Sequence, residues 1–326
     1  MVLKKIWRRE DGSVAVIAAV AFTLIIALCG LVIDLGTAYM QGSVSQTAAD
    51  AAALAAGTLL PVSADDNAKI QQIKSTAADY AVKNGVPADN VEAVDMEDIS
   101  GGRCYGVRVR LKTDVSYGFG PILGINGTTV SKSAKVTLKP ASSSTAVVPL
   151  GIEQTRLQEL LAANQTQHLV IKYGGGGGTE GFFGALDLDG VKGGGAKDFE
   201  SWLAFGYDGI LRIGDVLPVE PGNMAGPTTE AFTTRYSQCT HYAGGGGCTL
   251  EHFDPDCPRV VTLIVYSLVD SHTVKVKGFV PFILEGTNSK GEIVASKITF
   301  QTQQGESEGV IGGTGDYGIY RIRLVE

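Results

Sequence analysis

The stretch Ser13–Ile33, SVAVIAAVAFTLIIALCGLVI, decides how this chain is organised. It is 21 residues long and carries no charge. As a helix rising about 1.5 Å per residue it reaches roughly 31 Å, the thickness of the hydrocarbon core of a bilayer. Four cations precede it in the segment 1–12, namely Lys4, Lys5, Arg8 and Arg9. Because such cations favour the cytoplasmic side, the pattern predicts a transmembrane helix over 13–33, a cytoplasmic tail over 1–12 and an extracytoplasmic remainder.

A cleaved signal peptide is the competing interpretation of this pattern. Its apolar core is usually about 7–15 residues long and ends at a small-x-small site. The run in this chain is longer and continues into Asp34-Leu35-Gly36. Prepilin processing needs a glutamate at the fifth position after the cut, whereas Gly30 is followed by Asp34 at the fourth position. We therefore expect an uncleaved anchor.

The membrane helix is predicted to continue outward to about Leu60. The sequence after Asp34 is rich in alanine, which favours helix, and it contains no proline before Pro61. Small side chains recur there at spacings of three and four residues and form one stripe. Since small residues let helices approach closely, we expect this stripe to pack against another helix.

Two carboxylates on this predicted helix are candidate contact residues. Asp34 lies at the edge of the apolar run, where it either contacts a partner or simply marks the point at which the helix meets water. Asp50 lies among alanines, and exposure on the polar face is its ordinary interpretation, with contact to a partner helix as the alternative.

Residues 34–139 are predicted to form a small α+β unit. A second helix is indicated from Asp65 to Asn84 by its apolar face and by the Gly85 and Pro87 that follow. After it the period changes to two, because Tyr105, Val107, Val109 and Leu111 alternate with polar residues or glycine, which is typical of a half-buried strand. Thr128–Leu138 is expected to form another strand.

A linker over 140–146 is predicted to separate this unit from a β-rich domain over 147–326, because Pro140 and a serine-rich stretch bury little apolar surface. Short helices are expected over 153–163 and 196–205. Four β-rich runs predict successive strands of an antiparallel sheet, over 260–269, 274–284, 292–301 and 317–325. The expected fold class is therefore α+β, with an N-terminal transmembrane helix extended outward, a small helix-plus-sheet unit and a β-rich antiparallel C-terminal domain.

Charge and motif content argue against two classes of function. The formal net charge is −7, and an acidic protein without basic clusters is a poor ligand for nucleic acid. Nucleophilic catalysis needs a serine or cysteine beside a histidine and an orienting acid, and no such signature surrounds the four histidines. We expect neither an enzyme nor a cofactor-binding protein.

Four cysteines, Cys104, Cys239, Cys248 and Cys257, lie in the predicted extracytoplasmic part, where cysteines tend to form disulfides. Three connectivities are possible. Zinc binding with His241 and His252 is the alternative, but structural zinc sites usually show C-x2-4-C or H-x3-5-H pairs. The eight-residue gaps between the later cysteines do not match this spacing, so we expect disulfides and no metal.

Asp187-x-Asp189-Gly190 has the spacing that begins a calcium loop. A complete loop needs a ligand at its fifth position and a bidentate glutamate at its twelfth, which here are Val191 and Asp198. An ordinary Asp-Gly turn is therefore the expected structure.

Several features of the first 60 residues occur together: Gly12, the apolar span, Val32-Ile33-Asp34-Leu35-Gly36, Tyr39, Gln46 and Ala49–Ala55. In this combination the region resembles the N-terminal region of TadG-like (TadE/G-like) proteins of Flp/Tad pilus assembly. A weaker resemblance, to TadG-like proteins of Gram-positive relatives, involves Val148–Ile152, Glu220–Met224 with Gly226–Thr228, and Gly278–Val280. Some TadG-like proteins carry a D-x-S-x-S metal motif, which this chain lacks.

The resemblance implies a single-pass protein of the cytoplasmic membrane that acts in pilus assembly or anchoring. Its expected partners are the membrane, other Tad/Flp pilus-assembly proteins and further copies of itself. The residues assigned to helix packing or partner contact are Gly30, Asp34, Gly36, Tyr39, Gln46, Asp50, Ala51 and Leu54. A membrane-anchored surface adhesin is the alternative from the binding class, and a tethered hydrolase is the alternative from the enzyme class.

Overall fold

The computed structural model describes residues 11–171, 184–190, 195–220, 225–242, 247–287 and 293–325. Most of the predicted tail over 1–12 therefore lies outside the described residues. The chain divides into two compact units, Met1–Val136 with Leu324–Glu326, and Thr137–Arg323.

Helix α1 (Asp11–Gly57) dominates the first unit, and its 47 residues extend over about 70 Å. Every side chain from Val14 to Cys29 is exposed. From Gly30 onward one face becomes buried at spacings of three or four residues, and that face includes Gly30, Asp34, Gly42, Ser45, Ala49, Ala52 and Ala56. Within the described residues, α1 is the only helix long and apolar enough to cross a membrane. The predicted continuation of the apolar helix beyond Ile33 is confirmed.

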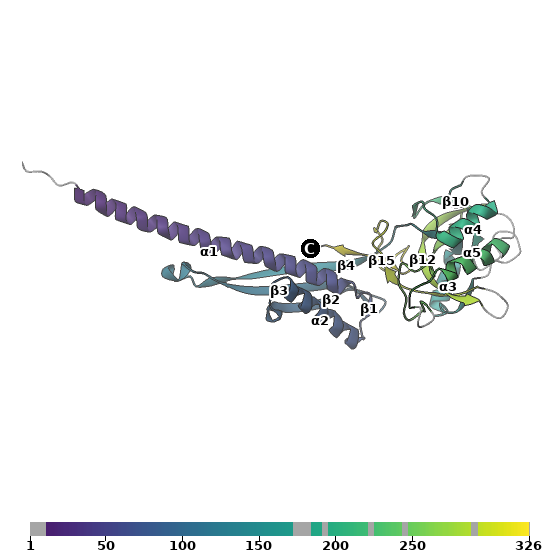
Figure 1. Ribbon diagram of the computed structural model, residues 1–326, viewed down its shortest axis with the longest axis horizontal. Coiled ribbons are helices and arrows are strands. Elements are labelled where there is room, and N and C mark those ends of the chain that lie inside the picture. Colours follow the sequence, from purple (N-terminus) through teal and green to yellow (C-terminus); the bar gives the residue numbers. More distant parts are fainter. Residues whose placement is uncertain are drawn as a thin grey trace, which may run out of the picture. The chain divides into compact units, whose positions relative to one another are not determined.

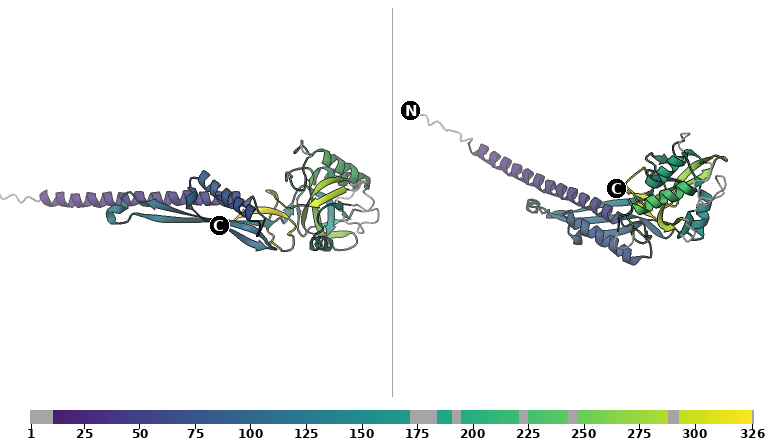
Figure 2. Two further views of the ribbon diagram at one scale, coloured as in Figure 1. Left: turned by 90° about the horizontal axis from the view of Figure 1, so that it is seen from below. Right: turned by 45° about the vertical axis from the view of Figure 1, so that its right-hand side comes forward.

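The C-terminal half of α1 packs against a sheet and a second helix of the same unit (Figures 1 and 2). The sheet contains β1 (Val62–Ser63), β2 (Val91–Ser100), β3 (Arg103–Ser116) and β4 (Gly127–Pro140), with β1, β2 and β4 all paired to β3. The predicted alternation in β3 is observed, because Val107, Val109 and Leu111 are fully buried. Helix α2 (Asn67–Lys83) buries Ile73, Ala77 and Ala81.

Two short 3₁₀ helices complete the first unit. They are η1 (Ala88–Asn90), which follows α2, and η2 (Gly120–Leu123), which lies between β3 and β4. Helix α2 begins at an N-cap, Asp66, whose side chain accepts the backbone N–H of Lys69 at 3.1 Å.

A seven-stranded sheet forms the centre of the second unit. Its strand order is β7-β13-β12-β11-β6-β8, with β10 paired to β12. The strands are β6 (Val147–Glu153), β7 (Leu169–Ile171), β8 (Gly184–Ala185), β10 (Val216–Pro218), β11 (Val260–Leu268), β12 (Thr273–Thr287) and β13 (Ile293–Lys297). The pairing of β6 with β11 is parallel, whereas the other pairs of this sheet are antiparallel. The sheet predicted to be antiparallel is therefore mostly antiparallel, with one parallel pair of strands.

Helices α3 (Gln154–Ala162), α4 (Gly195–Phe205) and α5 (Ala225–Ser237) contribute to the core on one face of this sheet. Leu157, Phe199 and Phe232 from these helices join the apolar side chains of β6, β11 and β12 in one cluster. A second cluster contains the residues that alternate with these along the strands, such as Ile264 of β11 and Phe279 of β12. Because alternate residues of a strand point to opposite faces, both faces of the central strands are buried.

The segment 140–146, predicted as a linker, contributes to the second unit instead. Ser143 and Ser144 form β5, which pairs with β9 (Leu211–Arg212). Ala141 and Ser143 are 3% and 1% exposed. The serine-rich composition misled the prediction, because Ser143 is itself buried and its hydroxyl accepts the backbone N–H of the exposed Glu306 at 2.7 Å.

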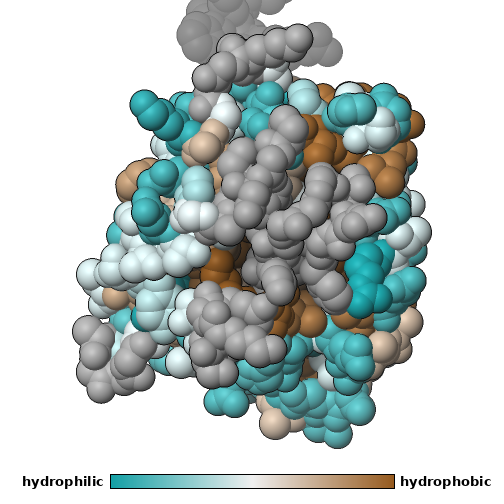
Figure 3. Space-filling view, turned by 90° about the vertical axis from the view of Figure 1, so that its right-hand side faces the viewer, coloured by the Kyte–Doolittle hydropathy of each residue, from teal (hydrophilic) through white to brown (hydrophobic). Residues whose placement is uncertain are grey.

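The remaining strands are β14 (Phe300–Gln301) and β15 (Ile319–Leu324), which pair in parallel. The face in Figure 3 is hydrophilic over much of its margin, and hydrophobic residues show between grey ones. These hydrophobic residues border segments outside the described ranges, so the face supports no functional assignment.

Candidate functional site

Asp34 on α1 binds the loop between β3 and β4. Its carboxylate accepts the backbone N–H groups of Gly118 at 2.8 Å, Phe119 at 3.0 Å and Gly120 at 2.6 Å. These N–H groups lie at the start of η2, where a helix leaves its first donors without intrahelical partners. Asp34 is 3% exposed. The carboxylate predicted to contact a partner is thus used within its own chain.

The loop approaches α1 closely because residue 30 is a glycine. A Cβ atom at Gly30 would lie 2.7 Å from both Cβ and Cγ of Phe119. Gly30 and Asp34 are four residues apart and therefore lie on one face of the helix. Because Gly30 has no side chain, Phe119 fits against the helix at this point. Asp34 accepts the backbone N–H groups of the residues before and after Phe119, Gly118 and Gly120.

We call residues 117–127, the connection between β3 and β4 together with the first residue of β4, the hairpin tip. Four of its apolar side chains are exposed: Phe119 by 42%, Ile122 by 82%, Leu123 by 63% and Ile125 by 49%. No charged residue occurs between Asp114 and Lys132. The tip therefore presents an uncharged apolar surface beside the C-terminal end of the apolar span.

Polar contacts hold the hairpin to α1 further along the helix. The hydroxyls of Ser45 and Thr113 are 3.3 Å apart and buried. The Gln46 amide donates to the Ser133 carbonyl at 3.1 Å and to the Asp50 carboxylate at 2.9 Å. The small-residue stripe that the sequence predicts for another helix is thus buried within the first unit.

The predicted packing residues fall into three groups. Gly30 and Asp34 are buried against the hairpin tip, and Gln46, Asp50 and Ala51 are half-buried. The residues that face outward are Gly36, Tyr39 and Leu54, with Tyr39 81% and Leu54 41% exposed. Sequence reasoning missed the hairpin tip, although its uncharged run of apolar residues and glycines was the available signal.

Cysteine pairing differs from the prediction. All five cysteines carry free thiols, and no disulfide is present among the described residues. Cys104 belongs to β3 of the first unit, where it lies opposite Val62 and Ile99 and is 1% exposed. Desolvation raises the pKa of its thiol. Cys104 belongs to the first unit and the other three cysteines to the second, so the structure does not show the two pairs that a count of four cysteines suggests.

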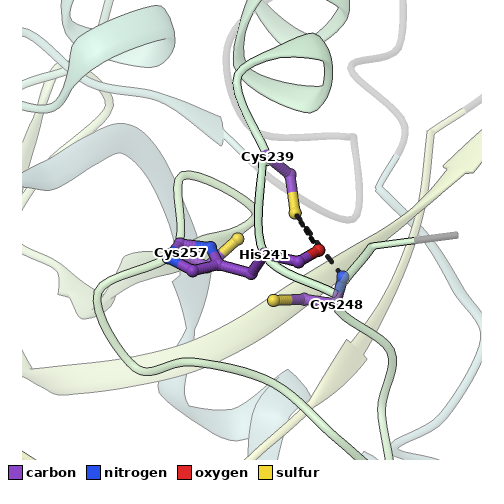
Figure 4. Close-up of side chains that lie close together, drawn as sticks. All are labelled: Cys239, His241, Cys248 and Cys257. Carbon is purple, nitrogen blue, oxygen red and sulfur yellow. Dashed lines mark hydrogen bonds between the residues drawn. The ribbon is translucent and has the colours of Figure 1, made fainter. Parts of the chain in front are cut away.

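The other three cysteines and one histidine lie together in the second unit (Figure 4). We call Cys239, His241, Cys248 and Cys257 the thiol–imidazole cluster. Each residue offers one ligand atom, and these atoms lie within 4.8 Å of one another. Cys239 and His241 follow α5, and Cys257 precedes β11.

The thiols of the cluster have opposed acidities. Desolvation acts to raise the pKa of Cys239, but hydrogen bonds, first among them the backbone N–H of Cys248, lower it to about 6. Desolvation raises the pKa of Cys257 to about 12. As the pH rises, the thiol of Cys239 therefore loses its proton well before the thiol of Cys257 does.

Asp187 and Asp189 form the turn that their spacing predicts. Asp187 accepts the backbone N–H groups of Asp189 at 3.2 Å and Gly190 at 3.0 Å, and Gly190 has φ +67°. Residues 191–194 of the candidate calcium loop lie outside the described residues. The geometry is that of an Asx turn.

One comparison with known proteins gives a match. Residues 12–64 match the family model described as putative Flp pilus-assembly TadE/G-like. The matched segment contains α1 and β1 but ends before the hairpin tip. No match was found among curated proteins or among solved structures. The weaker resemblance of the C-terminal half is not confirmed, and Pro221–Met224, part of its basis, lies outside the described residues.

Proposed function

We propose that this protein is a membrane-anchored, non-enzymatic component of Flp/Tad-type pilus assembly, with its bulk on the extracytoplasmic side. The observation that carries the proposal is the change in burial along α1. The side chains of residues 14–29 are all exposed, and the first buried residue after them is Gly30. The whole uncharged run 13–33, with 21 residues, matches the thickness of a bilayer core, and the family match over 12–64 supplies the link to pilus assembly.

The hairpin tip is the second membrane contact in this proposal. Gly30 precedes Ile33 by three residues, so Phe119 lies about 4.5 Å inside the outer end of the apolar run. Ile122 and Leu123 project from the same tip. Burying one such side chain fully contributes about 1.5–3 kcal/mol. The tip enters the outer leaflet beside α1 and fixes the first unit against the membrane surface.

Contacts with other pilus-assembly proteins use the outward face of α1. Gly36, Tyr39 and Leu54 have no role in packing against the hairpin, yet two of them are large and apolar. Scaffolding needs no catalytic group. The run Gly305–Gly309 has the G-x-S-x-G spacing of a nucleophile elbow, but β15, not a helix, is the next element after it.

Co-purification from membranes tests the proposed function. The full chain is extracted in detergent as wild type, as Tyr39→Ala and as Tyr80→Ala. Tyr80 is the matched control because it is 40% exposed but lies on α2. Pilus-assembly proteins identified by mass spectrometry are expected with wild type and Tyr80→Ala and are lost with Tyr39→Ala. Equal recovery from all three, or recovery of no such protein with wild type, contradicts the proposal.

A further inference from the structure

The thiol–imidazole cluster has the composition and dimensions of a structural zinc site. Zinc is bound by cysteine sulfur at about 2.3 Å and histidine nitrogen at about 2.0–2.1 Å in a tetrahedron. These lengths place neighbouring ligand atoms roughly 3.5–3.8 Å apart. The four candidate atoms of this cluster lie within 4.8 Å of one another, so small side-chain adjustments bring them to that geometry.

Each sulfur of the cluster already accepts a hydrogen bond from a backbone N–H group. Cys239 accepts from its own cluster neighbour Cys248 at 3.5 Å, Cys248 from Asp254 at 3.5 Å, and Cys257 from Arg259 at 3.4 Å. Such outer contacts orient metal-bound ligands and tune their charge.

The imidazole supplies the fourth ligand. Nδ1 of His241 is buried, and it has no hydrogen-bond partner among the described residues. A buried polar atom without a partner is costly and calls for an explanation. Nε2 of the same ring lies 3.8 Å from a carboxylate oxygen of Asp254. A histidine that offers one ring nitrogen to zinc and turns the other toward a carboxylate is a recurrent arrangement.

Charge around the cluster fits the same ion. Three thiolates, a neutral imidazole and Zn²⁺ leave one negative charge. The guanidinium of Arg259 donates to the Cys248 carbonyl at 3.1 Å and lies 3.7 Å over the ring of Tyr236. Arg259 therefore places a positive charge beside the site.

A disulfide explains the cluster less well. Three thiols form at most one disulfide, which leaves the third thiol and the buried imidazole nitrogen without partners. Cys248 and Cys257 are each 2% exposed and pack with Ile283 and Ile298. A metal uses all four groups and joins the segment after α5 to the segment before β11.

We propose that Cys239, His241, Cys248 and Cys257 bind one Zn²⁺ in a closed structural site of the second unit. All four ligands come from the protein, so no position remains for a substrate, and binding releases the thiol protons to solvent. The site is independent of the membrane anchor and of the proposed function.

Metal analysis of the full chain, purified in detergent under reducing conditions, tests the site. Wild type is expected to hold about one zinc per chain, and Co²⁺ in its place is expected to show a sulfur-to-metal charge-transfer band with tetrahedral d–d bands. The variants Cys248→Ala and His241→Ala are expected to lose at least tenfold in zinc affinity. Cys104→Ala and His252→Ala, outside the cluster, keep the metal.

The wild-type protein alone can overturn the proposal, so misfolding of a variant does not protect it. Absence of bound zinc after incubation with Zn²⁺, with three reactive thiols in the cluster, is incompatible with the site. A disulfide between two of the three cysteines, found by peptide mass spectrometry in protein isolated without reductant or thiol exchange, is equally incompatible with it.

Discussion

Replacing Gly30 by alanine tests the contact that holds the hairpin tip to α1. The added Cβ would lie 2.7 Å from two atoms of Phe119, a separation that side chains do not tolerate without a shift. Gly36 offers the matched control on the same helix, since a Cβ there meets nothing within 4 Å. Gly36→Ala therefore changes the helix backbone in the same way without touching the tip.

The expected difference between the two variants follows from this geometry. Alanine gains about 1 kcal/mol over glycine in a helix interior, and this gain is common to both positions. Overpacking a contact costs typically 1–3 kcal/mol. The common gain cancels, so Gly30→Ala is expected to weaken the attachment of the tip by about 1–3 kcal/mol relative to Gly36→Ala, roughly 5- to 150-fold in the opening equilibrium.

Hydrogen exchange of the full chain in detergent measures that opening. The backbone N–H groups of Gly118, Phe119 and Gly120 are protected by Asp34 and exchange when the tip detaches. Peptides covering 117–127 are expected to exchange about 5- to 150-fold faster in Gly30→Ala than in Gly36→Ala. Identical exchange in the two variants would refute the inference that residue 30 must be small to seat the tip.

Three further outcomes are expected. In a Trp7→Phe background, Ile122→Trp in vesicles should be quenched by lipids brominated near the headgroup, and quenching no greater than in the background alone contradicts insertion of the tip. The hydrogen bond from Arg108 holds the pKa of Glu97 below its usual value despite desolvation, so its stabilising contribution is present above about pH 4.3 and is lost as the pH falls through the lower folded-state pKa. Acid unfolding of Glu97→Gln should therefore show a shallower pH dependence than wild type, and equal slopes contradict this. Phe282→Ala should destabilise the second unit by about 3–5 kcal/mol in denaturant unfolding, since Phe282 is fully buried, and a change below 1 kcal/mol contradicts its place in the core.

Periodicity predicted the elements with strong local patterns. The apolar run and its alanine-rich continuation predicted α1, and the expected helix over 65–84 matches α2 within two residues at each end. The alternation around Val107 predicted β3. By contrast, β2 (Val91–Ser100) was not predicted, because its acidic residues interrupt any apolar face. Its backbone pairs with β3, and this pairing cannot be read from the sequence of β2 alone.

Periodicity shows which face of a helix is buried but not what buries it. The small residues from Gly42 to Ala56 predicted close approach of another helix, and α2 does pack against α1, but the chain's own sheet packs against α1 as well. Asp34 illustrates the same limit. Its partners are backbone N–H groups more than 80 residues away in the sequence. Almost every residue has a backbone N–H group, so the sequence does not show which ones Asp34 binds.

The thiol–imidazole cluster shows what the spacing of cysteines along the sequence does not reveal. Ligand pairs two to four residues apart fit one turn of chain, but Cys239 follows α5 and Cys257 precedes β11, and the fold brings these two distant segments together. Gaps of eight residues therefore exclude only locally formed sites.

Protease accessibility in intact spheroplasts tests the central claim, that α1 anchors the chain with its bulk outside the cytoplasm. For this assay the chain is tagged with one epitope at its N-terminus and a different epitope at its C-terminus. External protease is expected to remove the C-terminal epitope and leave the N-terminal epitope attached to a membrane-embedded fragment. Protection of the C-terminal epitope until the membrane is lysed would contradict the account.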